Sequence, residues 1–204
     1  MRIIAGTRKG MRLLEPPGPC SRPILDRVKE SLFNILATYG LPGGKVVADL
    51  FCGVGSLGLE ALSRGASLVT FVESDQRLIE VLHKNLLRAG MSEKAKVVTA
   101  DAFSSEPAWH LPDRLYDLVF IDPPYVATAD TGPGSRLYGL LEIVSGETTQ
   151  EALVVVRTHR LNALPQQCGQ LQVIDRREYG KMALTILARF QPSVVRVYRA
   201  LDGQ

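Results

Sequence analysis

From residue 45 onward, short apolar runs alternate with longer amphipathic stretches. The runs have few polar positions, which is typical of strands that are buried on both faces of a parallel sheet. The stretches between them repeat apolar residues at three and four positions, the spacing of helices that pack one face on a core. The pattern predicts an α/β fold with helices on both faces of the sheet. The expected parallel strands are residues 46–51, 67–73, 96–99, 117–122 and 152–158, with helices at 56–64 and 75–89.

The two ends of the chain show different patterns of apolar residues. Two more strand-like runs, residues 171–178 and 182–190, are separated by a hairpin-length turn, so we expect a seven-stranded sheet that finishes with an antiparallel hairpin. Near the start, two short apolar runs around a glycine-flanked turn predict a β-hairpin, and a helical pattern follows from residue 24. The expected organisation is an N-terminal extension at 1–44, a main domain at 45–190 and a tail of unassigned role at 191–204.

Composition limits the class of protein further. The chain has 204 residues, of which 46% are hydrophobic and 22% charged, as in an ordinary globular domain and unlike a disordered chain. No apolar run is long enough to cross a bilayer, and charge interrupts the N-terminus before a signal sequence could form, so we expect a cytoplasmic protein that binds no membrane. The three cysteines, Cys20, Cys52 and Cys168, form no C-x-x-C pair and predict reduced thiols and no metal site.

Positive charge is concentrated at the N-terminus. Residues 1–30 contain seven basic and three acidic side chains, whereas the whole chain carries a net charge of only +3. This asymmetry indicates a segment that meets a polyanion, although a solvated basic face would explain it too. The candidates for phosphate contact are Arg8, Lys9 and Arg12 in the hairpin and Arg22 and Arg27 beyond it.

A glycine-rich turn follows the first expected strand. It reads Asp49-Leu50-Phe51-Cys52-Gly53-Val54-Gly55-Ser56-Leu57-Gly58. Glycines here allow close approach of a ligand to the backbone and to the helix N-terminus behind it. The spacing also satisfies the dinucleotide fingerprint, so NAD binding is an alternative. Against NAD, a carboxylate just ahead of the glycines would repel a pyrophosphate, and the chain offers no second nucleotide-binding half.

Acidic residues stand at the ends of the next two strands. Glu73 ends the second strand, where a carboxylate can accept both hydroxyls of a ribose, while Asp75 is better placed as a helix N-cap. Asp101 and Ala102 hold the equivalent place after the third strand, where a carboxylate and a backbone N–H could recognise adenine. Each acid alone has a structural explanation, but three acids at matching strand ends indicate a nucleoside site.

The most specific motif closes the fourth strand and reads Asp122-Pro123-Pro124-Tyr125. Two successive prolines bend the chain rigidly and remove two N–H donors, which leaves nearby carbonyl groups free to accept. Asp122 and the Pro123 carbonyl could accept the two N–H bonds of a planar amine while Tyr125 stacks on its ring. A proline-rich turn is usually structural, but next to three strand ends that suggest a nucleoside we interpret it as the catalytic site.

At this point the sequence resembles a known family. The glycine turn, the strand-end acids and the DPPY motif together look like a Rossmann-like, class I S-adenosylmethionine-dependent methyltransferase that acts on an exocyclic amine. Three further segments resemble the RsmD family: M-R-I-I-A-G-x-x-K-G-x-x-L at the N-terminus, R-P-x-x-D-R-V-K-E-S-L-F-N-I-L at 22–36, and E-A-L-S-R-G-A at 60–66. Ile24 departs from the family pattern, which commonly has threonine there, and Cys52 replaces an alanine.

The resemblance implies an activity and a set of site residues. RsmD proteins methylate the 2-amino group of one guanine, conventionally position 966, in 16S ribosomal RNA. The implied partner is therefore 16S ribosomal RNA or the assembled small subunit. We also expect the protein to be a monomer without a metal. The implied S-adenosyl-L-methionine contacts are Asp49, Phe51, Gly53, Gly55, Glu73, Ser74, Asp101 and Ala102. The implied catalytic residues are Asp122, Pro123, Pro124 and Tyr125, and the five basic candidates would bind the RNA.

Other classes of protein fit the sequence less well. A DNA adenine methyltransferase can share the DPPY motif but needs a target-recognition region for which no insertion is large enough. An enzyme that methylates a protein glutamine amide is chemically similar, but typically has asparagine at the position of Asp122. A non-catalytic RNA-binding module would leave the strand-end acids without purpose, and an oxidoreductase would need a residue that handles hydride, for which there is no candidate.

Overall fold

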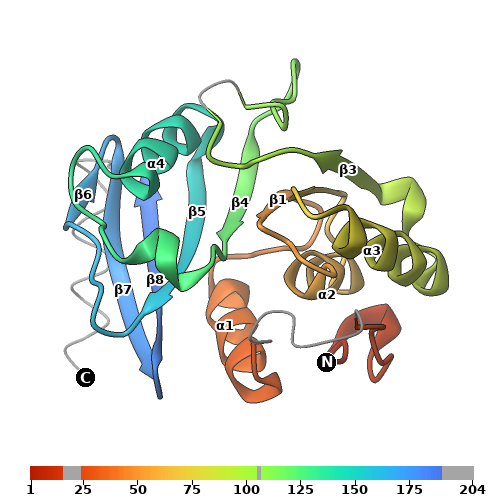
Figure 1. Ribbon diagram of the computed structural model, residues 1–204. Helices are drawn as coiled ribbons and strands as arrows, with labels where there is room; N and C mark the ends of the chain where they lie inside the picture. The colour runs from red at the N-terminus through yellow and green to blue at the C-terminus, as the bar shows by residue number, and fades with distance from the viewer. Residues whose placement is uncertain (16–23, 105–106, 190–204) are drawn as a thin grey trace.

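The computed structural model describes residues 1–15, 24–104 and 107–189. In this part of the chain one twisted sheet forms the centre of the molecule, with the strand order β3-β2-β1-β4-β5-β8-β7-β6 (Figure 1). The strands are β1 (Val46–Leu50), β2 (Leu68–Glu73), β3 (Ala95–Thr99), β4 (Tyr116–Ile121), β5 (Thr148–His159), β6 (Gln167–Cys168), β7 (Leu171–Tyr179) and β8 (Met182–Arg189).

The expected mixture of parallel and antiparallel strands is confirmed. Strands β3, β2, β1, β4 and β5 pair in parallel, whereas β8 pairs antiparallel with both β5 and β7. The sheet has one strand more than the seven predicted, because the two-residue strand β6 pairs with the start of β7. Strand β5 begins at Thr148, four residues earlier than expected, so it includes a polar segment ahead of its buried apolar residues.

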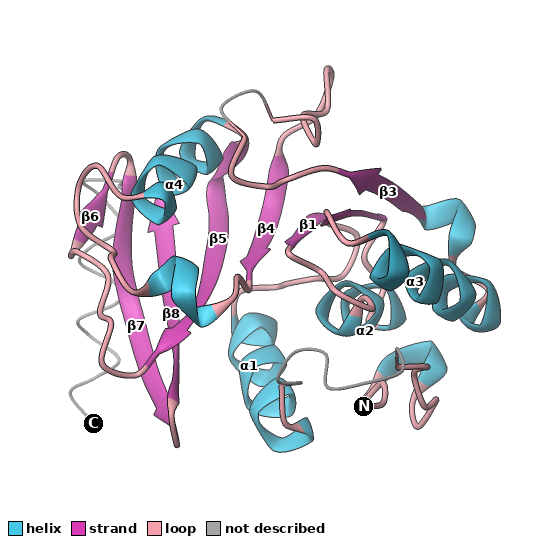
Figure 2. Ribbon diagram, viewed as in Figure 1, coloured by secondary structure: helices cyan, strands magenta, loops and turns pink. Residues whose placement is uncertain are grey.

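Helices cover both faces of the sheet (Figure 2). They are α1 (Asp26–Thr38), α2 (Ser56–Ser63), α3 (Gln76–Ala89) and α4 (Arg136–Gly146). The predicted N-cap is confirmed, since the Asp75 side chain accepts a hydrogen bond from the backbone N–H of Arg77 at the start of α3. Helix α4 was not predicted from the sequence, although Leu137, Leu140, Leu141 and Val144 have helical spacing.

The alternation of side chains along the central strands divides the core into two layers. Val47 of β1 and Phe120 of β4 belong to the layer that also contains the buried faces of α1, α2 and α3. Leu50 of β1 and Ile121 of β4 point to the opposite face and pack in the layer formed with α4. Helices therefore hold the parallel strands from both sides, which fixes the positions of their carboxyl ends.

The N-terminal segment forms a looser hairpin than the predicted one. Its paired strands reduce to a single bridge between Arg2 and Arg12, and the connecting turn contains a 3-10 helix, Gly6–Arg8. The turn is still closed by backbone hydrogen bonds, including Ile3 N–H to the Met11 carbonyl at 2.9 Å. Ile3 and Leu13 pack in the same core layer as α1 and β1, so this segment shares its core with the central sheet. Within the described residues, no helix is long and apolar enough to span a membrane.

Candidate active site

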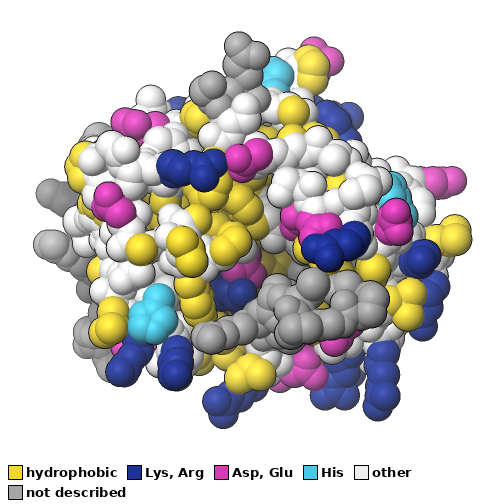
Figure 3. Space-filling view, in the orientation of Figure 1, with side chains coloured by type: hydrophobic (Ala, Val, Ile, Leu, Met, Phe, Trp, Pro, Cys, Tyr) yellow, Lys and Arg dark blue, Asp and Glu magenta, His cyan; other side chains and the backbone are white. Residues whose placement is uncertain are grey.

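Three acidic residues meet at the carboxyl edge of the parallel strands. Asp49 lies in β1, Glu73 ends β2 and Asp122 directly follows β4. These strands are neighbours in the sheet, so the three side chains line one cavity of about 810 Å³. Figure 3 shows a hollow in the middle of this face, bordered by hydrophobic side chains and with charged side chains inside. The volume lies within the range of small-molecule sites, roughly 300–1,000 Å³.

Strained backbone shapes the turn after β1. Phe51 has a φ of 60°, in the left-handed region that residues other than glycine seldom adopt. Gly53 follows with a φ of 56°, and its N–H donates to Glu73 Oε2 at 3.0 Å. The turn is thereby tied to the end of the next strand, and both Phe51 and Gly53 line the cavity.

Asp49, in strand β1, contacts the start of helix α2. Its Oδ2 accepts a hydrogen bond from the backbone N–H of Gly58 at 2.8 Å. A Cβ on Gly58 would lie 2.3 Å from Phe71, which explains the glycine by packing. Because a carboxylate already satisfies a donor at this helix terminus, the turn is poorly suited to a pyrophosphate. This geometry disfavours the NAD alternative.

Burial makes Asp49 unusual among the acids of the cavity. Its side chain is 1% exposed, and its pKa is raised to about 7. Burial is the main cause, the hydrogen bond from Gly58 opposes the rise, and the charges of Asp122 and Glu73 contribute to it. The residue nevertheless lines the cavity. A cationic group placed there would favour the ionised form and recover part of the cost of burial.

Glu73 is held by backbone donors on two sides. Its Oε1 accepts from the N–H groups of Ser74 and Asp75 at 2.8 and 3.0 Å, and Oε2 accepts from Gly53. A carboxylate has about four acceptor positions, so three backbone bonds orient it and still leave capacity for a ligand hydroxyl. Glu73 and Ser74 both line the cavity.

The region after β3 is arranged differently from the other strand ends. Asp101 lines the cavity, but its carboxylate accepts from Phe103 N–H at 3.0 Å and forms an ion pair with Arg136 of α4 at 2.9 Å. The Arg136 guanidinium lies over the Phe103 ring, 4.4 Å from its centre. Ala102 is 2% exposed, packs in the core and is absent from the cavity lining. Arg136 was not identified from the sequence because α4 itself was missed.

The four residues of the DPPY motif all line the cavity, opposite the end of β2. Burial raises the pKa of Asp122 to about 6, although the neighbouring Arg157 lowers it. The Arg157 Nε lies 2.6 Å from Asp122 Oδ1. Tyr125 begins a 3-10 turn, Tyr125–Thr128, and its ring meets His159 edge-on with centroids 5.7 Å apart.

Arg157 was not predicted as a site residue. It lies 35 positions from Asp122 in the chain, and the parallel pairing of Ile121 in β4 with Val156 in β5 brings the two side chains together. No local motif marks it, because it lies in the polar end of an apolar strand. Gly55, by contrast, was predicted to touch the cofactor but is absent from the cavity lining; a Cβ there would lie 2.5 Å from Leu82, so packing explains it.

The basic candidates for phosphate contact have different environments. Lys9, Arg12 and Arg27 are exposed on the surface. Arg8 is exposed as well, but its Nε donates to the Ala89 carbonyl at 2.5 Å, so it also binds the end of α3. Arg22 lies outside the described residues. Ile24, the departure from the family pattern, is buried and lines the cavity, where it adds apolar surface.

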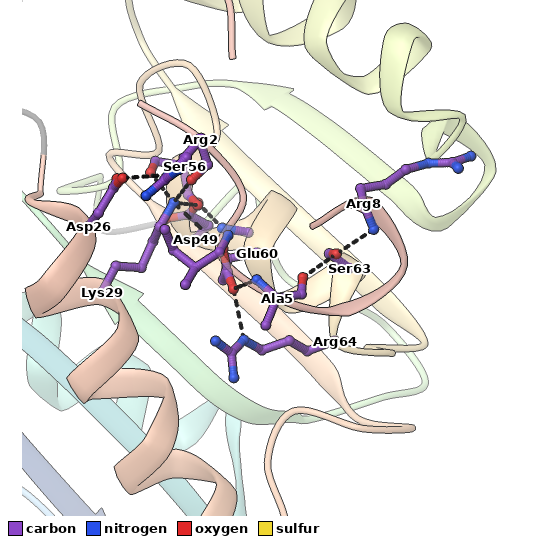
Figure 4. A network of polar contacts seen from close by, with 12 residues as sticks. Arg2, Ala5, Arg8, Asp26, Lys29, Asp49, Ser56, Glu60, Ser63 and Arg64 are labelled. Atoms are coloured by element: carbon purple, nitrogen blue, oxygen red, sulfur yellow. Dashed lines mark hydrogen bonds and ion pairs between the residues drawn. The ribbon is translucent and has the colours of Figure 1, made fainter. Parts of the chain in front are cut away.

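A buried polar network joins the N-terminal segment to the cavity wall (Figure 4). Glu60 of α2 is fully buried and accepts from the N–H groups of Ile4 and Ala5 at 2.7 and 3.0 Å. Its oxygens also pair with Arg64 at 2.8 Å and Lys29 at 3.6 Å. The Lys29 ammonium in turn donates to the Arg2 carbonyl and to Ser56, the first residue of α2, which lines the cavity. Nothing in the local sequence pattern indicated this network.

The fold and this cavity define a class of protein. An acid at each of three adjacent strand ends, around a nucleoside-sized cavity in a sheet with this order and a final antiparallel pair, is the arrangement of a Rossmann-like methyltransferase. In the described ranges, no group of three or more His, Cys, Asp or Glu side chains is arranged to hold a metal ion.

Comparison with known proteins agrees with that class. The chain belongs to the family described as conserved hypothetical protein 95, whose model matches residues 1–188, and the resemblance to RsmD proteins is confirmed. It is 36% identical to the ribosomal RNA small subunit methyltransferase D of Escherichia coli over 93% of this chain and 90% of that protein. It is 32% identical to YlbH of Bacillus subtilis over 91% of this chain and 97% of YlbH. The solved structure of yhhF from Escherichia coli has 34% identity and a TM-score of 0.76, covering 93% of this chain and 97% of yhhF.

Proposed function

We propose that this protein transfers a methyl group from S-adenosyl-L-methionine to the exocyclic 2-amino group of one guanine in 16S ribosomal RNA. The observation that carries the proposal is the placement of Asp122 and Tyr125 in the same cavity as Asp49 and Glu73. Relatives that match nearly the whole chain are named as ribosomal RNA methyltransferases, which supports ribosomal RNA as the substrate. The family resemblance suggests guanine 966, and a ribosomal substrate agrees with action in the cytoplasm.

The donor set of the cavity fits S-adenosylmethionine. Glu73 is oriented by backbone N–H groups and would accept the ribose hydroxyls, while Asp49 would meet the cationic amino group. Phe51, Leu78 and Phe103 supply apolar surface for the adenine ring, and Asp101 would accept from its amino group. When bound, the cofactor supplies an electrophilic methyl group attached to a sulfonium.

Asp122 would hold the target amine. The nitrogen of a guanine 2-amino group is a weak nucleophile because its lone pair is delocalised into the ring, so orientation has to provide most of the rate. Asp122 and the Pro123 carbonyl would accept the two amino protons and direct the lone pair into the cavity. Positive charge grows on this nitrogen as the new N–C bond forms and the C–S bond breaks, and the Asp122 carboxylate would stabilise that charge and take the released proton.

The edge of the cavity suits an unpaired base. RNA bases are read specifically when they are unstacked, and an aromatic ring replaces the lost stacking with roughly 1–3 kcal/mol per base. Tyr125 would provide that ring beside Asp122. Lys9, Arg12 and Arg27 lie at the surface and would contact phosphates of the surrounding RNA.

A methyl-transfer assay tests this function. Radiolabelled S-adenosylmethionine would be offered with unmodified small subunits, naked 16S RNA, DNA and a release factor, and the products analysed by nucleoside and peptide mass spectrometry. Label recovered as N2-methylguanosine, mapped to position 966, is the expected result, and the ratio between subunits and naked RNA identifies the true substrate. Cofactor binding without label in either RNA sample would contradict the proposal, and label in DNA or the release factor would assign another amine.

A further inference from the structure

Arg157 and Asp122 form an ion pair inside the candidate active site. The Arg157 Nε and the Asp122 Oδ1 are 2.6 Å apart, and the two side chains are only 11% and 19% exposed. Asp122 directly follows Ile121 of β4, and Arg157 directly follows Val156 of β5. Because Ile121 and Val156 are paired in the sheet, the sheet sets the separation of Asp122 and Arg157. Both residues line the cavity.

The surroundings of Asp122 are otherwise rich in negative charge. Asp49 of β1 and Glu73 of β2 line the same cavity, and Asp49 and Asp122 interact electrostatically. Tyr125 of the motif and His159 of β5 also lie nearby, with their rings in edge-on contact. Further cations around the cavity have acidic partners of their own: Arg136 pairs with Asp101, Lys29 with Glu60, and the Met1 ammonium with Glu15.

We propose that Arg157 is a positioning residue for methyl transfer, which fixes one oxygen of Asp122 and keeps its carboxylate ionised so that the other oxygen can accept a proton of a neutral aromatic amine. The inference rests on the proposed function for its substrate. A carboxylic acid in the protonated state would donate a hydrogen bond instead, and would repel the amino protons that the site has to hold. Arg157 therefore sets the kind of group that the site recognises, without touching the substrate.

The direction of the pH effect follows from the surroundings of the carboxyl group. Burial raises the pKa of Asp122 to about 6 and Arg157 opposes this rise. In the native protein the group is ionised above that pH, so turnover should be lost as the pH falls through about 6. Without the guanidinium, burial and the charge of Asp49 remain, the pKa of Asp122 moves upward, and the loss of turnover should begin at a higher pH.

The test compares Arg157→Met, Arg157→Lys and a matched control, Arg114→Met. Methionine keeps the length of the buried side chain, and lysine restores the charge. Arg114 is exposed in the segment that precedes β4, at the opposite end of that strand from Asp122. For each purified variant, kcat and KM for small subunits and for the cofactor would be measured between about pH 5 and pH 9, together with the thermal unfolding midpoint.

In Arg157→Met we expect kcat near pH 7 to fall about tenfold or more, about twofold from protonation of Asp122 and the rest because its carboxylate is no longer oriented. The acidic limb of the profile should shift upward by about one unit, and KM for the cofactor should stay within about twofold. Activity should recover partly at alkaline pH, and Arg157→Lys should lie between this variant and the native protein. The control should keep the native profile. A native profile in Arg157→Met, or an equal loss at every pH that lysine does not rescue, would overturn the positioning role.

A second measurement does not depend on the substrate. The titration of the Asp122 carboxyl carbon can be followed by NMR in the free protein and assigned with Asp122→Asn. The inference predicts a higher midpoint in Arg157→Met than in the native protein or in Arg114→Met, and an unchanged midpoint would overturn it. If the native protein methylates none of the offered substrates, the proposed function fails while this titration still decides the effect of Arg157 on Asp122.

Discussion

Glu60 and Asp122 are both carboxylates with little exposure to solvent, but their surroundings differ. Glu60 is enclosed by donors from three segments of the chain: the N–H groups of Ile4 and Ala5, Arg64 next to its own helix and Lys29 of α1. Asp122 has the cation Arg157 on one side and the cavity on the other. Figure 4 shows the contacts of Glu60 with Ala5, Lys29 and Arg64, whereas Asp122 lines the cavity.

The difference separates a structural role from a functional one. A carboxylate whose acceptor positions are filled by protein donors joins segments together, because each bond would be broken on unfolding. A carboxylate that borders a cavity keeps acceptor positions free for a ligand. Its buried charge is then stabilised by fewer protein groups, which costs free energy. That cost is visible as the raised pKa values of Asp49 and Asp122. The cavity thus concentrates unfavourable charge where a cationic cofactor and an amine would reduce it.

Removing the structural carboxylate should have the largest effect. Glu60→Ala leaves Lys29 buried without its acid and removes the acceptor for two backbone N–H groups. Breaking a buried ion pair from one side typically costs about 3–5 kcal/mol, so we expect the free energy of unfolding to fall by that amount. Denaturant unfolding would measure it. Glu80→Gln, an exposed acid of α3, is the control and should change stability by less than about 0.5 kcal/mol; a decrease no larger than that in Glu60→Ala would contradict the structural role.

Removing the functional carboxylate should affect turnover rather than stability. We expect Asp122→Ala to lower kcat about 100-fold or more, because the amine loses its acceptor and its base. Affinity for the cofactor, measured by calorimetry, should stay within about twofold, since Asp122 lies on the substrate side of the cavity. Full turnover in this variant would remove Asp122 from the mechanism, and a loss of cofactor binding would assign it to the other half of the site.

Asp49 should show a smaller effect that depends on pH. Since burial raises the pKa of its carboxyl to about 7, we expect cofactor affinity of the native protein to weaken as the pH falls through that value. Asp49→Asn should bind about tenfold more weakly at pH 8, because the amide cannot form a charge-assisted hydrogen bond, and should lose this pH dependence. Calorimetric titrations at several pH values would measure both, and equal pH dependence in the two proteins would assign the titration to another group.

The same substitution should alter stability in a defined direction. An acid whose pKa is higher in the folded than in the unfolded state stabilises the fold at low pH, and this contribution disappears as the pH rises from about 4 through about 7. Asp49→Asn has no such pH-dependent decrease. The unfolding free energy of Asp49→Asn relative to the native protein should therefore increase between pH 5 and pH 8, and a relative decrease would contradict the effect of burial.

The smallest effect is expected at the basic surface. Lys9→Ala combined with Arg12→Ala should weaken RNA binding several-fold and reduce the slope of log affinity against log salt by roughly 0.7–0.9 for each phosphate that is no longer neutralised. Binding to 16S fragments at several salt concentrations would measure this. Arg8 is left intact because its Nε also binds the Ala89 carbonyl, so its removal would disturb α3. An unchanged salt slope would remove Lys9 and Arg12 from the RNA interface.

The fold and the site also differ in how much of each could be predicted from the sequence. Apolar runs predicted every long strand of the sheet, and the rule that parallel strands end at one edge brought Asp49, Glu73 and Asp122 together. Helix α4 was missed because Gly139 and polar residues interrupt its apolar spacing, although Leu137, Leu140 and Leu141 carry the signal. The predicted hairpin became a turn with a single bridge, because its backbone groups bind Glu60 as well as each other.

Local order along the chain determined the elements of this protein, the acids at their ends and the rigid DPPY corner, because each depends on neighbouring residues and on the period of a strand or helix. Only the tertiary structure decided which partner each charge has. Arg157 reaches Asp122 across paired strands, and Lys29 reaches Glu60 between two packed helices. Such pairs join residues far apart in sequence, and their energy depends on burial that arises only when the core closes.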